Sequence, residues 1–195
     1  MQGSEIMPPK ARITKDMIID AGLGVVRSEG QDSLNVRRIA AELNCSTQPI
    51  MYHYKTVDEL KADIYAAADS FHTEYIMQSY DKADNQMLSI GLNYIRFAHD
   101  EKFLFRFLFQ SDKFHNMSFK ELLGNDDTDF LLQPLMQQTG LTKEQAKEAF
   151  ETLFICAHGF ASLLANNSIE YDEEHCVRLL SNTFTGIIGA IIKGE

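Results

Sequence analysis

The chain has 195 residues, enough for one substantial hydrophobic core or two small ones without a disulfide or metal to hold it together. Its hydrophobic content of 45% and only 4 prolines exclude a disordered chain. Helix-forming residues dominate and strand-like runs are scarce, so we expect an all-α fold. The three cysteines are scattered, no apolar run matches a membrane span, and no signal peptide is evident, so we expect a cytoplasmic protein with reduced thiols and no membrane contact.

The first predicted element is a helix that Thr14 caps and Gly30 ends. Before it, residues 1–9 show no periodicity and are expected to form a flexible arm. The residues expected on the inner face of this helix are Ile18, Ala21 and Val25.

Two short amphipathic helices are predicted next. Asn35 is the expected N-cap of the first helix, and Asn44 marks its end, because asparagine tolerates the left-handed conformation. Ser46 is the expected N-cap of the second helix, which has Pro49 in its first turn. Two helices joined by about three residues form a helix-turn-helix. The first of them has helical apolar spacing at Val36, Ile39, Ala40 and Leu43.

The second helix of this pair decides the functional interpretation. Ile50 and Tyr54 lie four residues apart and would pack against the first helix. The side chains left facing outward can form hydrogen bonds, and a helix of this width fits the major groove of DNA. In the alternative interpretation, the polar face simply meets water, because short amphipathic helix pairs are common. The outward-facing residues are Thr47, Gln48, Tyr52 and His53.

The order of these segments carries a resemblance to a known family. ITKDMIIDAGLGVVRSEG is followed by VRRIAAEL, the turn NCS, TQPIMYHY and KTVDEL. Over residues 14–60 this order resembles the DNA-binding domain of the tetracycline-repressor (TetR) family of bacterial regulators. Ala40, Asn44 and Ile50 occupy the family's small, turn and buried apolar positions.

The chain departs from the family pattern at two positions. Met51 stands where the family usually has a tyrosine, and Val57 stands where it usually has a lysine that contacts a phosphate. Lys55 is the candidate replacement for that lysine. We expect Arg37 to contact DNA from the first helix of the pair, and Thr47, Gln48 and Pro49 to read bases. The full set of expected DNA-binding residues is Asn35, Arg37, Ser46, Thr47, Gln48, Pro49, Tyr52, His53 and Lys55.

The net charge of −10 is unusual for a DNA-binding protein, but the acidic residues are unevenly spread. Through residue 60 the chain has seven basic and eight acidic residues, and between residues 10 and 55 the basic residues are in slight excess. This is a weak electrostatic footprint for DNA. We therefore expect specific binding by a dimer with modest affinity for random DNA.

A capping box at residues 56–59 predicts a long helix that runs from residue 57 to near Ser79. A second helix is predicted over residues 87–98. In EKFLFRFLFQ the phenylalanines alternate as in a strand, but the leucines between them leave no polar face. We therefore predict a short buried helix there, capped by Asp100. The apolar stripe expected on the long helix consists of Leu60, Ile64, Ala67, Phe71 and Tyr75.

The last part of the chain is predicted to hold three more helices. Residues 111–127 are expected to form a polar loop, and a short helix should follow and end near Gly140. A capping box at Thr142 opens a helix through Leu164, and Asp172 caps the last one. The segments YIRFAHDEKFLFRFLF and CAHGFASLLANN also resemble segments of the TetR family's ligand-binding domains.

The resemblance implies a three-helix DNA-binding domain at residues 10–56 and a helical effector-binding and dimerisation domain at residues 57–195. In the family, the last two helices pair with their copies in a second subunit. The implied protein is a homodimeric regulator, which we expect to be a repressor, on a palindromic operator in double-stranded DNA. A small apolar or amphipathic effector would release it. The candidate effector-binding residues are Phe71, Tyr75, Phe103, Phe107, Phe154 and His158, each of which has ordinary core packing as its alternative role.

Two other classes of protein have weaker support in the sequence. An enzyme would need a buried acid or base, for which His99, His115 and His158 are the candidates, but no phosphate loop or nucleophile elbow is present. Neither His175-Cys176 nor Cys156-x-His158 has the spacing of a zinc site, so we expect no metal and no cofactor. A purely structural or interaction protein would be favoured if the helix-turn-helix did not bind DNA.

Overall fold

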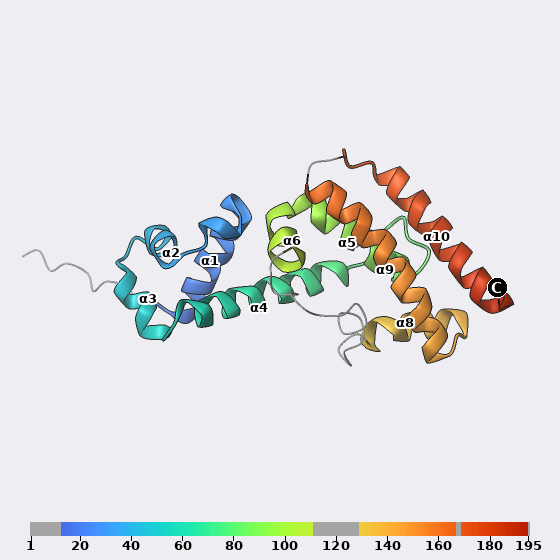
Figure 1. Cartoon of the computed structure of the whole chain (residues 1–195), viewed down its shortest axis with the longest axis horizontal. Coiled ribbons are helices and arrows are strands. Elements are labelled where there is room, and N and C mark those ends of the chain that lie inside the picture. The colour runs from blue at the N-terminus through green and yellow to red at the C-terminus, as the bar shows by residue number, and fades with distance from the viewer. Residues whose placement is uncertain (1–12, 111–128, 167–168, 195) are drawn as a thin grey trace, which may run out of the picture. The chain divides into compact units, whose positions relative to one another are not determined.

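The computed structural model describes residues 13–110, 129–166 and 169–194 (Figure 1). These residues form helices and contain no strand, so the expected all-α fold is confirmed. The predicted arm at residues 1–9 and the predicted loop at residues 111–127 lie outside the described residues. The chain forms two compact units, Met1–Ile64 and Tyr65–Glu195, which divide within helix α4 (Val57–Ile76). The domain boundary predicted at residue 57 falls at the start of this helix and stays a prediction.

The described residues of the first unit form three α-helices and the first turns of α4. Helix α1 (Lys15–Glu29) is followed by a 3-10 turn, η1 (Gln31–Ser33). Helices α2 (Val36–Glu42) and α3 (Thr47–His53) then form the predicted pair, with a short connection between them. Burying each large aliphatic side chain contributes roughly 1.5–3 kcal/mol to stability. The fully buried residues that these helices share include Ile18, Val25, Ile39, Ile50 and Ile64.

The ends of α1 and α2 lie where the sequence predicts them. The Thr14 hydroxyl accepts a hydrogen bond from the backbone N–H of Met17 at 3.2 Å. The Asn35 side chain accepts one from the backbone N–H of Arg38 at 3.0 Å. Gly30 closes α1 with a positive φ of 87°, and Asn44 takes a φ of 50° in the turn after α2. These four expectations are confirmed.

Ser46 occupies the N-cap position of α3, but its hydroxyl makes no capping hydrogen bond. A serine cap usually accepts from the second or third N–H of the helix. The third residue of α3 is Pro49, which has no N–H to donate. The predicted position of the cap is therefore confirmed, whereas the predicted bond is wrong.

The start of α4 differs from the predicted capping box in one bond. The Thr56 hydroxyl accepts from the N–H of Glu59 at 3.1 Å, as expected. The Glu59 carboxylate, however, accepts from the N–H of Lys55 at 2.8 Å, one residue before the expected donor. Helix α4 ends at Ile76 and does not reach Ser79.

The apolar stripe predicted on α4 is wrong beyond Ile64. Ala67, Phe71 and Tyr75 are half-buried. The aromatic rings were expected to face inward because they are the more apolar side chains, but the rotation of the helix is set by its neighbours. The residues that the helix buries recur at intervals of four and are Leu60, Ile64, Ala68, His72 and Ile76.

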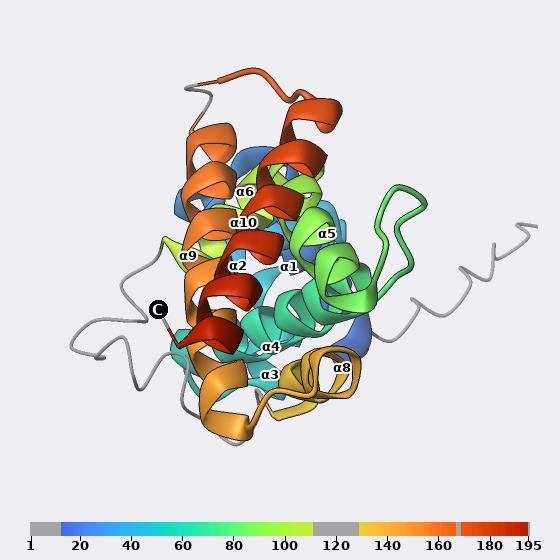
Figure 2. The ribbon, with the colours of Figure 1, turned by 90° about the vertical axis from the view of Figure 1, so that its right-hand side faces the viewer.

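The second unit is organised around α5 (Gln86–Asp100), where ten of the 15 residues are buried. Such burial places α5 in the centre, where it packs chiefly against α9 (Lys143–Ala165). Helix α10 (Glu173–Lys193) lies alongside α9 and also contacts α5 (Figure 2). Helix α8 (Asp129–Thr139) packs against α5 and α9.

The caps of the last two helices are confirmed. Thr142 and Gln145 form both bonds of the capping box at the start of α9. The Asp172 carboxylate accepts from the N–H of His175 at 3.0 Å at the start of α10. The sequence predicted both starts because the capping groups lie within one turn of each other.

The predicted short helix at EKFLFRFLFQ is confirmed as α6 (Lys102–Phe109), but the predicted cap is wrong. The Asp100 carboxylate instead accepts a hydrogen bond from the Tyr75 hydroxyl at 2.6 Å, and it also pairs with His99 and Arg96. These partners occupy the carboxylate, and α6 begins after Glu101 without a side-chain cap.

Helices α9 and α10 are long and apolar enough to cross a membrane by length and composition, contrary to the expectation that no segment would be. The central helices of soluble proteins pass the same test. Helix α9 buries Ala149, Leu153, Ala157 and Ala161 within the second unit.

The two glycines of α1 provide a matched test of packing in the first unit. A Cβ at Gly22 would lie 2.4 Å from Ile64 Cδ1, whereas a Cβ at Gly24 would have no atom within 4 Å. We predict that Gly22→Ala lowers the free energy of unfolding by about 1–3 kcal/mol through overpacking. Gly24→Ala should raise it by about 0.5–1 kcal/mol, since alanine is the better helix former. Chemical denaturation would measure both, and equal effects would contradict the packing of α1 on Ile64.

Candidate functional site

Helix α3 separates its buried residues from its polar ones. Ile50 is fully buried and Tyr54, just after the helix, is 3% exposed. Tyr52, by contrast, is 78% exposed. Pro49 is half-buried. The outward face is therefore polar, as predicted, and its other exposed members are Ser46, Thr47, Gln48 and His53, with Lys55 following the helix.

Gln48 and Tyr52 form a hydrogen-bonded pair on this outward face. The Gln48 Nε2 donates to the Tyr52 hydroxyl at 3.0 Å across one turn of helix. A side-chain amide has a second N–H and a carbonyl oxygen, which together can bind the major-groove edge of adenine. The pair thus orients the amide without consuming its capacity to read a base.

His53 is exposed, but one of its ring nitrogens is already engaged. Its Nε2 donates to the backbone carbonyl of Ile13 at 3.0 Å, because a carbonyl oxygen can only accept. In the neutral ring the remaining Nδ1 is then an acceptor and cannot donate to a phosphate. A backbone contact by His53 requires either protonation of the ring or loss of the bond to Ile13.

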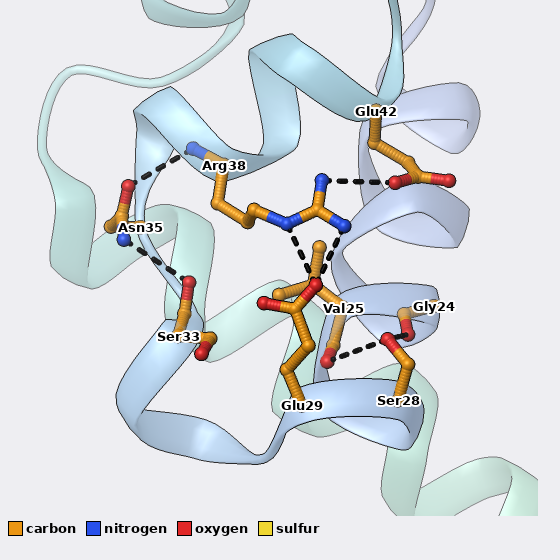
Figure 3. Close-up of polar contacts among 8 residues, drawn as sticks. All are labelled: Gly24, Val25, Ser28, Glu29, Ser33, Asn35, Arg38 and Glu42. Carbon is orange, nitrogen blue, oxygen red and sulfur yellow. Dashed lines mark hydrogen bonds and ion pairs between the residues drawn. The ribbon is translucent and has the colours of Figure 1, made fainter.

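The two adjacent arginines of α2 differ in their surroundings. The Arg38 guanidinium binds the Glu29 carboxylate at 2.7 and 2.9 Å and the Glu42 carboxylate at 3.0 Å (Figure 3). These hydrogen bonds lower the pKa of Glu29 and raise that of Arg38. Arg37 is exposed, and its side chain makes no hydrogen bond or ion pair to another described residue. Arg37 is therefore available to a ligand, whereas Arg38 ties α2 to α1.

Asn35 uses both ends of its side-chain amide within the protein (Figure 3). Its oxygen caps α2, and its Nδ2 donates to the backbone carbonyl of Ser33 at 3.1 Å. Its direct role is thus to fix the start of α2, and a DNA contact by Asn35 stays a prediction.

The departures from the family pattern leave apolar side chains near this face. Met51 is 38% exposed and Val57 is 40% exposed. The side chain of Lys55 is also exposed and makes no ion pair within the described part of the chain, which leaves it available as the predicted replacement for a lysine at position 57.

In the second unit, the structure brings two of the predicted effector-binding residues together. The rings of Phe154 and His158 stack at a centroid distance of 5.5 Å. The Tyr94 hydroxyl lies 2.8 Å from His158 Nδ1, and its ring contacts that of Phe109 at 5.4 Å. These rings come from α5, α6 and α9. We call the aromatic cluster the set formed by His72, Tyr94, Phe105, Phe109, Phe154 and His158.

The other four predicted residues lie apart from these two. Phe71 and Tyr75 pack on Phe97, at centroid distances of 6.1 and 5.3 Å. Phe107 packs edge-on against Tyr65, and Phe103 lies beside the cationic ends of Lys102 and Arg106. The predicted six residues are therefore divided among different places on α4, α6 and α9, and their role in binding stays a prediction.

The predicted effector-binding residues lack four members of this cluster: Tyr94, Phe105, Phe109 and His72. The least expected of them is His72, because histidine is less often fully buried than phenylalanine. It is 7% exposed, and its ring makes edge-to-face contacts with Tyr94, Phe97 and Phe109 at 4.9–5.5 Å. Its Nε2 has no hydrogen-bond partner among the residues that the structure describes. An unsatisfied buried polar group costs about 1–3 kcal/mol. His72 lies four residues after Ala68 and four residues before Ile76, both of which are buried. This helical spacing is the sequence signal that could have revealed its burial.

Burial keeps the polar groups of the cluster neutral. Loss of hydration lowers the pKa of His72 to about 4, and it also lowers the pKa of His158. The same effect raises the pKa of the Tyr94 hydroxyl. At neutral pH the cluster therefore presents uncharged hydrogen-bonding groups.

Within the described residues, no group of three His, Cys, Asp or Glu side chains could hold a metal ion. The Cys156 Sγ lies 3.6 Å from the Thr183 hydroxyl oxygen, and Cys176 is buried. Burial raises the pKa of Cys176 to about 11, which keeps it a thiol at neutral pH.

No protein-family model matches the chain. It is 22% identical over 192 residues to YobS of Bacillus subtilis (strain 168), an uncharacterised HTH-type transcriptional regulator, and the match covers 97% of this chain and 98% of that one. A protein of Mesorhizobium loti MAFF303099, assigned as a TetR-family transcriptional regulator, superposes with a TM-score of 0.60 at 15% identity, covering 90% of this chain and 95% of the other.

Another similar structure is ActR of Streptomyces coelicolor. Its apo form superposes with a TM-score of 0.54 at 18% identity, covering 96% of this chain and 100% of ActR. ActR has also been solved in complex with (S)-DNPA. These likenesses establish the fold.

The buried His72 makes stability sensitive to acid. Its pKa is about 4 in the folded protein against 6.5 when exposed, so below about pH 6.5 the unfolded chain binds a proton that the folded protein does not. We predict that the stability of the wild type relative to His72→Phe falls by up to about 1.4 kcal/mol per pH unit between about pH 6 and pH 4.5. Denaturation of both proteins across this range would measure it.

The control for this prediction is His175→Phe, at an exposed position on α10. Its stability should follow that of the wild type across the same range. A parallel pH dependence of the wild type and His72→Phe would contradict the neutral, buried state of His72.

Proposed function

Since the chain has the fold of the TetR-family transcriptional regulators, we propose that it is a sequence-specific DNA-binding regulator. It binds a palindromic operator as a homodimer, represses transcription, and is released by a small apolar or amphipathic effector. It acts in the cytoplasm without a metal or cofactor. The observation that carries this proposal is α3, which buries Ile50 in the first unit and turns Thr47, Gln48 and Tyr52 outward.

The outward face of α3 supports a division of roles among the predicted contacts. Thr47, Gln48 and Pro49 occupy the first turn, which in helix-turn-helix proteins meets the base edges. Tyr52 lies one turn later and Lys55 just beyond the helix, where phosphates flank the groove. Arg37 binds a phosphate from the first turn of α2.

Exposed apolar residues on the last two helices support the homodimer. Ile155 and Leu163 on α9 are 52% and 47% exposed, and Ile192 on α10 is 64% exposed. A Cβ added at Gly159 or at Gly186 would have no atom within 4 Å, so the space beside each glycine is open. A second helix can therefore approach them closely. A two-fold dimer places its recognition helices at successive major grooves about 34 Å apart.

Effector release requires that the two units be coupled. Helix α4 is one unbroken helix with residues in both units, so a change at its C-terminal half can reach the first unit through its backbone. Coupling between two sites of this kind is typically worth about 1–3 kcal/mol.

The test is binding of the purified protein to a duplex that carries the palindrome upstream of its own gene, with random DNA as the control. The expected result is salt-dependent, sequence-selective binding with two subunits per duplex, measured by titration and by sedimentation. Selection from random duplexes would follow if that palindrome were not bound. Failure of this selection to enrich any sequence would refute the proposal.

Gln48→Ala tests base readout. The variant should lose about 1–3 kcal/mol of binding free energy at the operator and little on random DNA, because an amide that binds a base edge contributes to specificity. Tyr52→Phe removes the hydroxyl that orients this amide and that would meet a phosphate, so it should show a smaller loss that falls partly on random DNA as well. Equal losses on both DNAs would mean that Gln48 contacts only the backbone.

Arg37→Ala and Arg38→Ala form a matched pair of charge deletions in the same helix. Arg37→Ala should weaken binding to all sequences and reduce the slope of affinity against salt by about one counterion, because it removes one cation from a phosphate. Arg38→Ala should leave the salt dependence unchanged, because Glu29 and Glu42 already hold that guanidinium. Measuring the DNA affinity of both variants over a range of salt concentrations would test this. A larger change in the salt slope for Arg38→Ala than for Arg37→Ala would mean that Arg38, not Arg37, contacts the phosphate.

A further inference from the structure

We propose that the effector is an uncharged aromatic molecule that carries one hydroxyl group, and that it binds in the aromatic cluster with this group paired to His72. This inference rests on the proposed function, because it names the chemical class of the molecule that would release the regulator. It keeps Phe154 and His158 of the predicted effector-binding residues and adds His72, Tyr94, Phe105 and Phe109. It leaves out Phe71, Tyr75, Phe103 and Phe107.

The walls of the cluster suit a flat ring. Tyr94 contacts Phe105, Phe109 and Phe154 at centroid distances of 5.4–5.8 Å, with tilted or edge-on geometry. Aromatic rings favour these offset arrangements, and a ligand ring that entered the cluster would make contacts of the same kind. Phe109, Phe154 and His158 are half-buried, so the cluster extends from the interior to the surface of the second unit.

The unpaired Nε2 of His72 points to a polar group on the ligand. This nitrogen is buried without a partner among the edges and faces of aromatic rings. In the neutral imidazole, Nε2 is either a donor or an acceptor, and a hydroxyl can serve either form. A ligand hydroxyl would supply the missing hydrogen bond, whereas an unsubstituted ring would leave it missing.

His158 supplies a second polar atom in the same cluster. The Tyr94 hydroxyl and His158 Nδ1 form a hydrogen bond of 2.8 Å in which either atom can be the donor. His158 Nε2 makes no hydrogen bond within the described residues, and it is a donor in one tautomer of the neutral ring and an acceptor in the other. A ligand hydroxyl can pair with it in either tautomer.

The charge state of the cluster excludes ions. His72, Tyr94 and His158 are all neutral, and none of them belongs to an ion pair in the described part of the chain. A carboxylate buried here would lose its hydration without gaining a counter-charge. The site therefore selects a hydroxyl over an ionised group of similar size.

Three probes with the same ring system separate these effects: 2-naphthol, naphthalene and 2-naphthoate. Their affinity for the full chain would be measured by saturation-transfer NMR. Side-chain ¹⁵N spectra of histidine-labelled protein would show whether the ligand hydroxyl forms a hydrogen bond with His72. We expect 2-naphthol to bind about tenfold more tightly than naphthalene and to shift the His72 resonance. We expect 2-naphthoate not to bind at millimolar concentration.

His72→Phe keeps an aromatic ring at this position and removes both ring nitrogens, so the preference for 2-naphthol over naphthalene should fall by about threefold or more, and His158 would account for what remains. His175→Phe is the control, and it should keep the tenfold preference. The proposal is overturned if no probe binds, if 2-naphthoate binds as well as 2-naphthol, or if His72→Phe retains the preference. Operator binding without any probe is measured separately, so failure here leaves the DNA-binding proposal standing, and the converse also holds.

Discussion

The burial of Ile50 is the constraint on which the proposed DNA-binding face depends. Helix α3 has seven residues, and an isolated helix of that length is unstable in water. It holds its place because Ile50 is fully buried and Tyr54 is 3% exposed. Lys15 lies 5.3 Å from the centre of the Tyr54 ring and binds the Asp63 carboxylate at 2.6 Å. This packing fixes the rotation of α3, and the rotation decides which polar side chains face outward.

The same principle separates residues that are neighbours in the sequence. Successive residues of a helix point about 100° apart, so Arg37 and Arg38 face different surroundings. Arg38 meets Glu29 and Glu42 and becomes part of the framework, whereas Arg37 is exposed and makes no ion pair with another described residue. The modest excess of basic residues in this part of the chain therefore overstates the number of cations that are available to DNA.

The parts of the fold that could be predicted are those that local chemistry determines. Thr14, Asn35, Thr142 and Asp172 cap their helices as expected, because the donor and acceptor lie within one turn. The cap predicted at the start of α6 failed because another part of the chain binds the capping side chain. Asp100 is taken by Tyr75, which is distant in the sequence. The polar residues on the outward side of α3 were predicted because one buried pair, Ile50 and Tyr54, sets the rotation of the helix. The aromatic cluster depends on how four helices pack.

His72 shows why the second site was harder to predict. From residue type alone, the polar His72 would be placed on the exposed side of α4 and its apolar neighbour Phe71 on the buried side. The structure has the reverse order: His72 is buried and Phe71 is only half-buried. A phenylalanine at position 72 would satisfy the cluster without leaving a nitrogen unpaired. The imidazole therefore carries a cost of about 1–3 kcal/mol that packing does not require. Proteins retain such costs where function uses the group, and a hydrogen bond to a ligand would offset this one only when the ligand is bound.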